Sequence, residues 1–139
     1  MKKFYIFHIA LIISSSSFTG CAVTEKPRGN DAETLASVWI ERWNENKPDL
    51  IPLAEDFVHT SPFGRIEGRE VYLETVKPMA KRNVTYLKVL RTLAGPDEAV
   101  IHFEMHTPKG LIHVSDWVAV KDGRITAVHS FYDATRLRY

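Results

Sequence analysis

The feature that most constrains the fold is a series of strand-like runs in the second half of the chain. The runs are rich in β-branched and aromatic residues and cover residues 84–93, 99–107, 111–120 and 124–133. Turn signals separate them, and Lys121-Asp122-Gly123 is typical of a tight hairpin in which Gly123 takes a positive φ angle. Consecutive strands joined by short turns predict an antiparallel meander.

Helical patterns come before these runs. Asp31 is a predicted cap for a helix whose apolar stripe includes Leu35, Trp39 and Trp43. A short second helix is expected over 49–54, a strand over 57–61, and a third helix from Gly68 that Pro78 kinks or ends. Helices followed by a meander predict an α+β fold, with a curved antiparallel sheet over three N-terminal helices.

The N-terminus has the order of a secretory signal. Lys2 and Lys3 precede an apolar run over 4–13, which is too short for a permanent membrane span, and small residues lead to Cys21. A small residue and then cysteine after such a core resembles the bacterial lipobox. The resemblance implies cleavage before Cys21, a lipid anchor on its sulfur and, with Ala22 next, an outer-membrane location facing the periplasm. The alternative is an ordinary signal peptide with an incidental cysteine.

The chain therefore divides into a signal peptide (1–20), a tether (21–30) and one domain (31–139). Removing residues 1–20 takes away Lys2 and Lys3 and no acid, so the formal charge changes from +1 to −1. A nucleic-acid-binding surface needs a net basic face, so nucleic acid is not expected as a partner.

Side-chain alternation assigns a face to each strand residue. With a three-residue turn at Lys121–Gly123, Val120 is expected opposite Arg124 and Asp116 opposite Val128. Ile101 is then expected opposite Asp116. One face collects Ile101, Phe103, Met105, Ile112, Val114, Asp116, Val118, Val128, Ser130 and Tyr132. The other collects His102, Glu104, His106, His113, Ser115, Trp117, His129 and Phe131. The apolar set is predicted to face inward.

Asp116 is the one acid in the inward set. Loss of hydration raises the pKa of such a carboxyl, which is then suited to act as a general acid or hydrogen-bond donor. The alternative is a carboxylate satisfied by an indole N–H of Trp39 or Trp43, or by water.

Two motifs carry a family resemblance. Residues 57–64, Phe-Val-His-Thr-Ser-Pro-Phe-Gly, are followed by Gly68-Arg69-Glu70, and Asp122-Gly123-Arg124-Ile125 leads to Phe131-Tyr132-Asp133. In this order they resemble the SnoaL-like branch of the nuclear transport factor 2-like superfamily. The resemblance implies a cone-shaped fold with one pocket and a dimer through the outer sheet face. The superfamily includes isomerases, cyclases, dehydratases, hydrolases and binding proteins, so it leaves function open.

Within the superfamily, Asp116 approximately matches an acid of ketosteroid isomerases. Their aspartate base lies just before Pro-Phe-Gly, where this chain has Ser61, and their phenol falls near Trp39. The acid–base pair is incomplete, so steroid isomerisation is not expected.

His59 shares a face with Ser61 and is the candidate base. The alternative is a core histidine bonded to the backbone. The predicted ligand-binding residues are Trp39, Trp43, Ser61, Tyr72, Met79, Ile101, Phe103, Met105, Val114, Val118, Val128, Ser130 and Tyr132. The histidines of the other face fit no metal motif, and no metal or cofactor is predicted.

Three functions remain open. The first is a membrane-anchored domain that binds a small apolar molecule without catalysis. The second is a dehydratase, isomerase or hydrolase that uses His59 and Asp116 for proton transfer. The third is an envelope lipoprotein whose outer face, with Trp117 and Phe131, binds a protein partner.

Overall fold

The computed structural model describes residues 32–84 and 86–137. The predicted signal peptide (1–20), the lipidated Cys21, the tether (21–30) and the helix cap Asp31 lie outside the described residues.

The described chain forms one six-stranded sheet with the strand order β2-β1-β6-β5-β4-β3. The strands are β1 Leu53–Ser61, β2 Gly64–Glu67, β3 Tyr86–Ala94, β4 Glu98–Thr107, β5 Gly110–Lys121 and β6 Arg124–Tyr132. Neighbouring strands are antiparallel except β1 and β6, which are parallel. The sheet is therefore mixed, and the prediction of a purely antiparallel sheet was wrong. Residue alternation cannot reveal a pairing between strands so distant in the sequence.

Two α-helices accompany the sheet: α1 is Ala32–Asn44 and α2 is Arg69–Asn83. The predicted helix over 49–54 is only a 3-10 turn, η2, at Pro48–Leu50. Pro52 explains the difference, because it disfavours the helical conformation at Ile51, which is extended with φ −72° and ψ 131°. The chain then enters β1. The third expected helix is α2, and it continues past Pro78 to Asn83.

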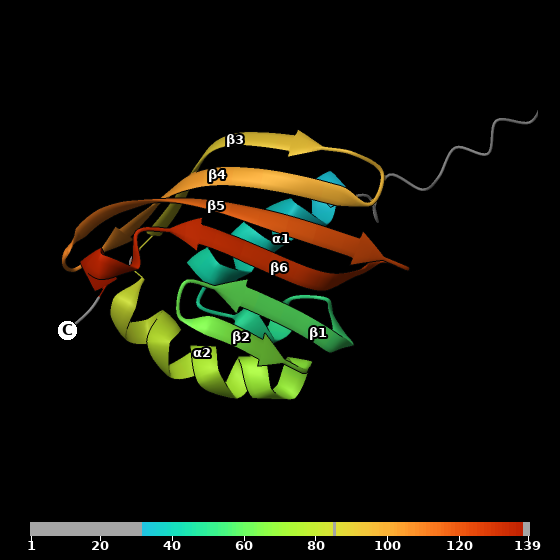
Figure 1. Cartoon of the computed structure of the whole chain (residues 1–139), viewed down its shortest axis with the longest axis horizontal. Coiled ribbons are helices and arrows are strands. Elements are labelled where there is room, and N and C mark those ends of the chain that lie inside the picture. Colours follow the sequence, from blue (N-terminus) through green and yellow to red (C-terminus); the bar gives the residue numbers. More distant parts are fainter. Residues whose placement is uncertain (1–31, 85, 138–139) are drawn as a thin grey trace, which may run out of the picture.

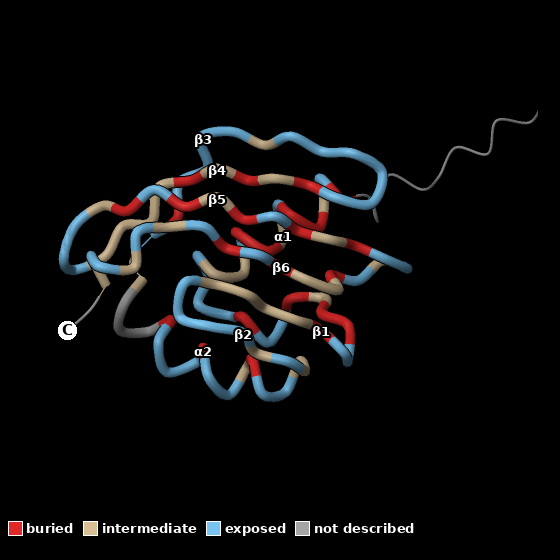
Figure 2. The backbone as a smooth tube through the Cα atoms, in the orientation of Figure 1, coloured by how far each residue is buried: buried red, intermediate tan, exposed pale blue. Residues whose placement is uncertain are grey.

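Both helices pack against the sheet, and together they close its inner face. The helix α1 contacts β3, β4 and β5, while α2 contacts β1 and β2. Figure 1 shows α1 behind the curved sheet and α2 beneath β1 and β2. Buried residues alternate with intermediate or exposed ones along β5, as Figure 2 shows. The expected division of β4, β5 and β6 into an inner apolar face and an outer polar face is confirmed.

The strand register confirms one hairpin and corrects the other. In β4 and β5, Ile101 pairs with Asp116 as expected. In β5 and β6, however, Asp116 pairs with Ser130 instead of Val128. The turn is a two-residue one, with φ angles of 50° at Asp122 and 73° at Gly123, and a bulge follows it in β6. The resulting shift is two residues, so each side chain keeps its predicted face.

Candidate ligand-binding cavity

A cavity of about 490 Å³ lies between the two helices and the inner face of the sheet. Ten of the predicted ligand-binding residues line it: Trp39, Trp43, Ser61, Tyr72, Met79, Phe103, Met105, Val114, Ser130 and Tyr132. His59 also lines it. None of the lining residues in the described part of the chain is Lys, Arg, Asp or Glu. The volume falls in the range of small-molecule sites, and the wall is mostly apolar.

Three predicted ligand-binding residues do not line this cavity. Ile101, Val118 and Val128 point inward as expected, but each is only 1% exposed and belongs to the hydrophobic core. Alternation identifies the face of a residue, and it does not show where along the strand the core ends and the cavity begins.

Sequence reasoning also missed part of the wall. The residues it did not name are Phe63, Ile66, Thr75, Val76, Val84, Leu87 and Leu137. Phe63 lies in the short connection between β1 and β2, and Ile66 lies in β2, which was not predicted. Leu137 belongs to a C-terminal 3-10 turn, η3, at Ala134–Leu137. A strand or helix pattern gives no signal for such a residue.

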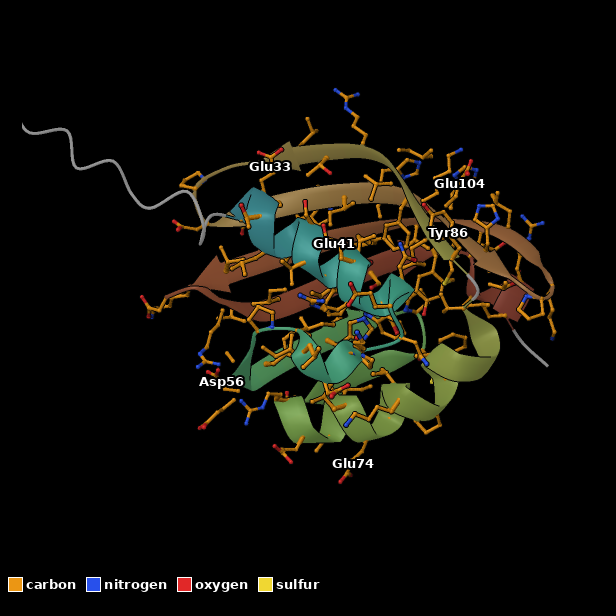
Figure 3. All side chains as sticks on the ribbon, turned by 180° about the vertical axis from the view of Figure 1, so that it is seen from behind. Glu33, Glu41, Asp56, Glu74, Tyr86 and Glu104 are labelled. Atoms are coloured by element: carbon orange, nitrogen blue, oxygen red, sulfur yellow. The ribbon has the colours of Figure 1, made fainter. Side chains whose placement is uncertain are left out.

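Asp116 lies on the inner face beside this cavity without lining it. Its residue is 3% exposed, and the indole Nε1 of Trp39 donates a hydrogen bond of 2.9 Å to its Oδ2. Burial raises the pKa of Asp116 to about 6, while the Ser130 hydroxyl and the Trp39 N–H favour the charged form and limit the rise. The predicted indole contact is thus confirmed for Trp39. Other carboxylates, such as those of Asp56 and Glu74, extend from the outside of the fold (Figure 3).

His59 reaches the same inner region from β1. The parallel pairing of β1 with β6 sets His59 opposite Val128, and its Nε2 lies 3.1 Å from the Oγ of Ser130. The expected alternative, a histidine bonded to the backbone, is therefore replaced by a bond to a side chain. Burial, followed by the influence of His129, lowers the pKa of His59 to about 4. The ring is neutral at pH 7.

These contacts form one polar chain across the inner face. It runs from His59 to Ser130, which lies opposite Asp116 in the β5–β6 ladder and limits its pKa through a side-chain hydrogen bond, and it ends at Trp39. Tyr72 packs beside it, with ring centroids 5.2 Å from His59 and 5.9 Å from Trp39. Burial raises the pKa of Tyr72 well above its ordinary value, so its hydroxyl stays protonated. The arrangement can position a hydrogen-bonding group of a ligand, and those of its members that line the cavity are uncharged at pH 7.

The outer face carries the predicted histidine row. His102 and His113 stack with centroids 5.6 Å apart, and the Nδ1 of His102 lies 3.0 Å from the Oγ of Ser115. Among residues 32–84 and 86–137, no cluster of three or more His, Cys, Asp or Glu side chains is placed to hold a metal ion. A more open hollow of about 940 Å³ also lies here, bordered by β1, β6, β5 and the turn between β3 and β4.

The comparison with protein families identifies the chain. The SnoaL-like domain family matches residues 36–128, which is more than half of the sequence. The chain therefore belongs to the SnoaL-like family. A comparison with curated proteins gives no match.

Solved structures share the fold. A nuclear transport factor 2-like protein of unknown function from Cytophaga hutchinsonii has a TM-score of 0.66 and 19% identity, over 76% of this chain and 93% of its own. A provisionally assigned ketosteroid isomerase from Kribbella flavida has a TM-score of 0.64 and 23% identity, over 73% and 77%. A provisionally assigned polyketide cyclase from Sinorhizobium meliloti has a TM-score of 0.62 and 19% identity, over 70% and 93%. At these identities the likeness concerns the fold alone.

Proposed function

We propose that this SnoaL-like domain binds a small apolar molecule in the inner cavity, and that a lipid on Cys21 holds it at the outer membrane, facing the periplasm. The observation that carries the binding proposal is the cavity wall. It encloses about 490 Å³, is mostly apolar and, among the residues that the structure describes, includes no Lys, Arg, Asp or Glu. His59 also lines the cavity, and its low pKa keeps its imidazole ring uncharged at neutral pH. Such a site favours uncharged ligands, because a buried ion would find no partner at the wall.

A thermal-shift screen of small apolar compounds on the purified protein tests this proposal. A compound that binds only the folded state at a hundred times its Kd stabilises the protein by about 2.7 kcal/mol. We expect Met105→Trp, which fills the cavity from β4, to abolish the shift. Glu104→Gln, one residue away and on the outer face, is the matched control and should keep it. Equal shifts in both variants would place binding elsewhere, and mass spectrometry of an organic extract would identify a co-purified ligand.

Catalysis is the second candidate, supported by the chain that links His59, Ser130 and Asp116. Two observations make it the less favoured one. Asp116 does not line the cavity, so a substrate there would not touch its carboxyl. A histidine with a pKa of about 4 is also a weak general base at pH 7. The test is turnover of isomerase, dehydratase and hydrolase substrates. If the protein turns one over and both His59→Gln and Asp116→Asn abolish that activity, catalysis becomes the favoured function.

The anchoring proposal depends on Cys21, and it is supported by the sequence pattern before it. In the described ranges no helix is long and apolar enough to cross a membrane. We expect the protein expressed in bacteria to incorporate an alkyne-tagged fatty acid and to fractionate with the outer membrane. Cys21→Ser should remove both properties. Tag incorporation that survives this substitution would refute a lipid on Cys21.

A homodimer or a protein partner on the outer face is a separate proposal. Trp117 is 55% exposed and Phe131 is 47% exposed, and their ring centroids lie 6.3 Å apart. Exposed aromatic pairs of this kind are common at interfaces. Sedimentation over a range of protein concentrations tests it, because a dimer becomes more populated as the concentration rises. An unchanged association state would count against it.

A further inference from the structure

The polar chain on the inner face constrains where the protons lie. An ionised carboxylate only accepts hydrogen bonds. Asp116 takes the indole proton of Trp39 on Oδ2, whereas Oδ1 has no hydrogen bond of good geometry within the described ranges. Ser130 sits directly opposite Asp116 in the β5–β6 ladder, and both residues are buried. A hydrogen bond from the Ser130 side chain also limits the rise in the pKa of Asp116, so we assign the Ser130 hydroxyl proton to this carboxylate.

The position of the Ser130 proton fixes the tautomer of His59. Once the hydroxyl hydrogen points to Asp116, Oγ has only lone pairs to offer its second neighbour. That neighbour is His59 Nε2, at 3.1 Å. The contact is a hydrogen bond only if Nε2 carries the proton, and a neutral imidazole then has a bare lone pair on Nδ1.

The Nδ1 atom is the remaining polar atom of the His59 ring. Within the described residues it makes no hydrogen bond, although His59 lines the cavity. The ring is held by Tyr72 and Trp39, whose centroids lie 5.2 Å and 6.4 Å away. Because Tyr72 and Trp39 fix the imidazole ring on two sides, His59 Nδ1 has a defined orientation.

We propose that His59 Nδ1 is the acceptor that selects the ligand, so that the cavity prefers uncharged molecules bearing a hydroxyl or N–H donor. The inference rests on the proposed binding function and names its ligand class. Ser130 and Asp116 are positioning residues that act through His59. A ligand donor satisfies Nδ1, whereas a carbonyl oxygen or an ether at the same place faces another lone pair.

The test uses three probes with the same ring system and the full-length protein. These are 2-naphthol, which donates, 2-acetylnaphthalene, which only accepts, and 2-methylnaphthalene, which does neither. Calorimetric titration gives the Kd of each. Because apolar transfer also differs between the probes, the informative quantity is the affinity of naphthol relative to methylnaphthalene. We expect His59→Phe, which removes the acceptor and keeps an aromatic ring, to lower that ratio roughly tenfold.

The outcomes separate the two proposals. A ratio unchanged in His59→Phe, with the probes still bound, would overturn the inference and leave the binding function standing. Failure of all three probes to bind the parent protein would contradict the proposed function and the inference with it. Ser130→Ala serves where His59→Phe fails to fold. It should shift preference from naphthol toward acetylnaphthalene, because the tautomer is no longer fixed.

A spectroscopic measurement tests the proton positions without any ligand. Long-range proton–nitrogen correlation of the imidazole ring distinguishes the two neutral tautomers. For the parent protein at pH 7.5 we expect protonated Nε2 and unprotonated Nδ1 in His59, and a mixture of tautomers in Ser130→Ala. Protonated Nδ1 in the parent protein would refute the proposal.

Discussion

The two faces of the sheet come from the same strands, yet their polar side chains differ in number, burial and pairing. On the outer face, polar side chains are numerous, partly exposed and paired locally, as in the contact of 3.4 Å between Lys88 and Glu104. On the inner face they are few, buried and joined in one chain from His59 to Trp39. The comparison teaches that burial decides the chemistry of a side chain. The pKa of His59 falls to about 4 and that of Asp116 rises to about 6, because both lose water.

The largest expected difference between the faces concerns stability. Phe103 and Glu104 are adjacent in β4, and only Phe103 is in the core, with 3% exposure. We expect Phe103→Ala to lower the free energy of unfolding by about 3–5 kcal/mol. Glu104→Ala breaks a surface ion pair and should cost no more than about 1 kcal/mol. Chemical denaturation measures both, and similar losses would mean that the inner face is not the core.

The next prediction concerns His59 and pH. Its folded-state pKa lies below the ordinary 6.5, so the unfolded chain binds the proton more tightly between pH 6.5 and 4. The stability that neutral His59 contributes is therefore complete above pH 6.5 and is lost as the pH falls through 4. As the pH falls from 7 to 4, the free energy of unfolding of His59→Gln should rise by about 3 kcal/mol relative to that of the parent. The exposed His113→Gln is the control, and an equal gain there would contradict the effect of burial.

Asp116 should make the free energy of unfolding depend on pH in the opposite direction, by a slightly smaller amount. Its pKa rises from 3.8 to about 6, so the folded state holds the proton more tightly in that window. This contribution to stability is complete below pH 3.8 and is lost as the pH rises through 6. Relative to the parent, Asp116→Asn should gain about 2 kcal/mol in the free energy of unfolding between pH 4 and pH 7. Denaturation curves at several pH values give the result. In the parent protein the opposite pH dependences of His59 and Asp116 largely cancel, so the test compares Asp116→Asn with the parent. If the difference in their free energies of unfolding does not change with pH, the carboxyl of Asp116 is solvated.

The smallest effect is expected on the outer aromatic pair. Trp117→Ser with Phe131→Ser removes two exposed rings and should change the free energy of unfolding of the monomer by less than about 1 kcal/mol. The same double variant should reduce any self-association seen by sedimentation of the parent protein. A large loss of monomer stability would mean that the outer face contributes to the core.

What the sequence determined by itself is the side of the sheet on which each residue lies. Ile101, Asp116 and Ser130 could be assigned to the inner face because alternation is a local property of an extended backbone. The assignment survived a turn that is one residue shorter than expected, since the bulge in β6 made the total shift an even number.

Only the tertiary structure decided which inner residues meet. Trp39 and Asp116 are 77 positions apart, and His59 and Ser130 are 71 apart. Their contacts depend on where α1 crosses the sheet and on the parallel pairing of β1 with β6, which no local pattern encodes. For the same reason the sequence could not show that, of three valines in the core, Val114 lines the cavity whereas Val118 and Val128 do not. The physical cause is that backbone geometry fixes direction residue by residue, whereas a cavity exists only where distant elements leave space between them.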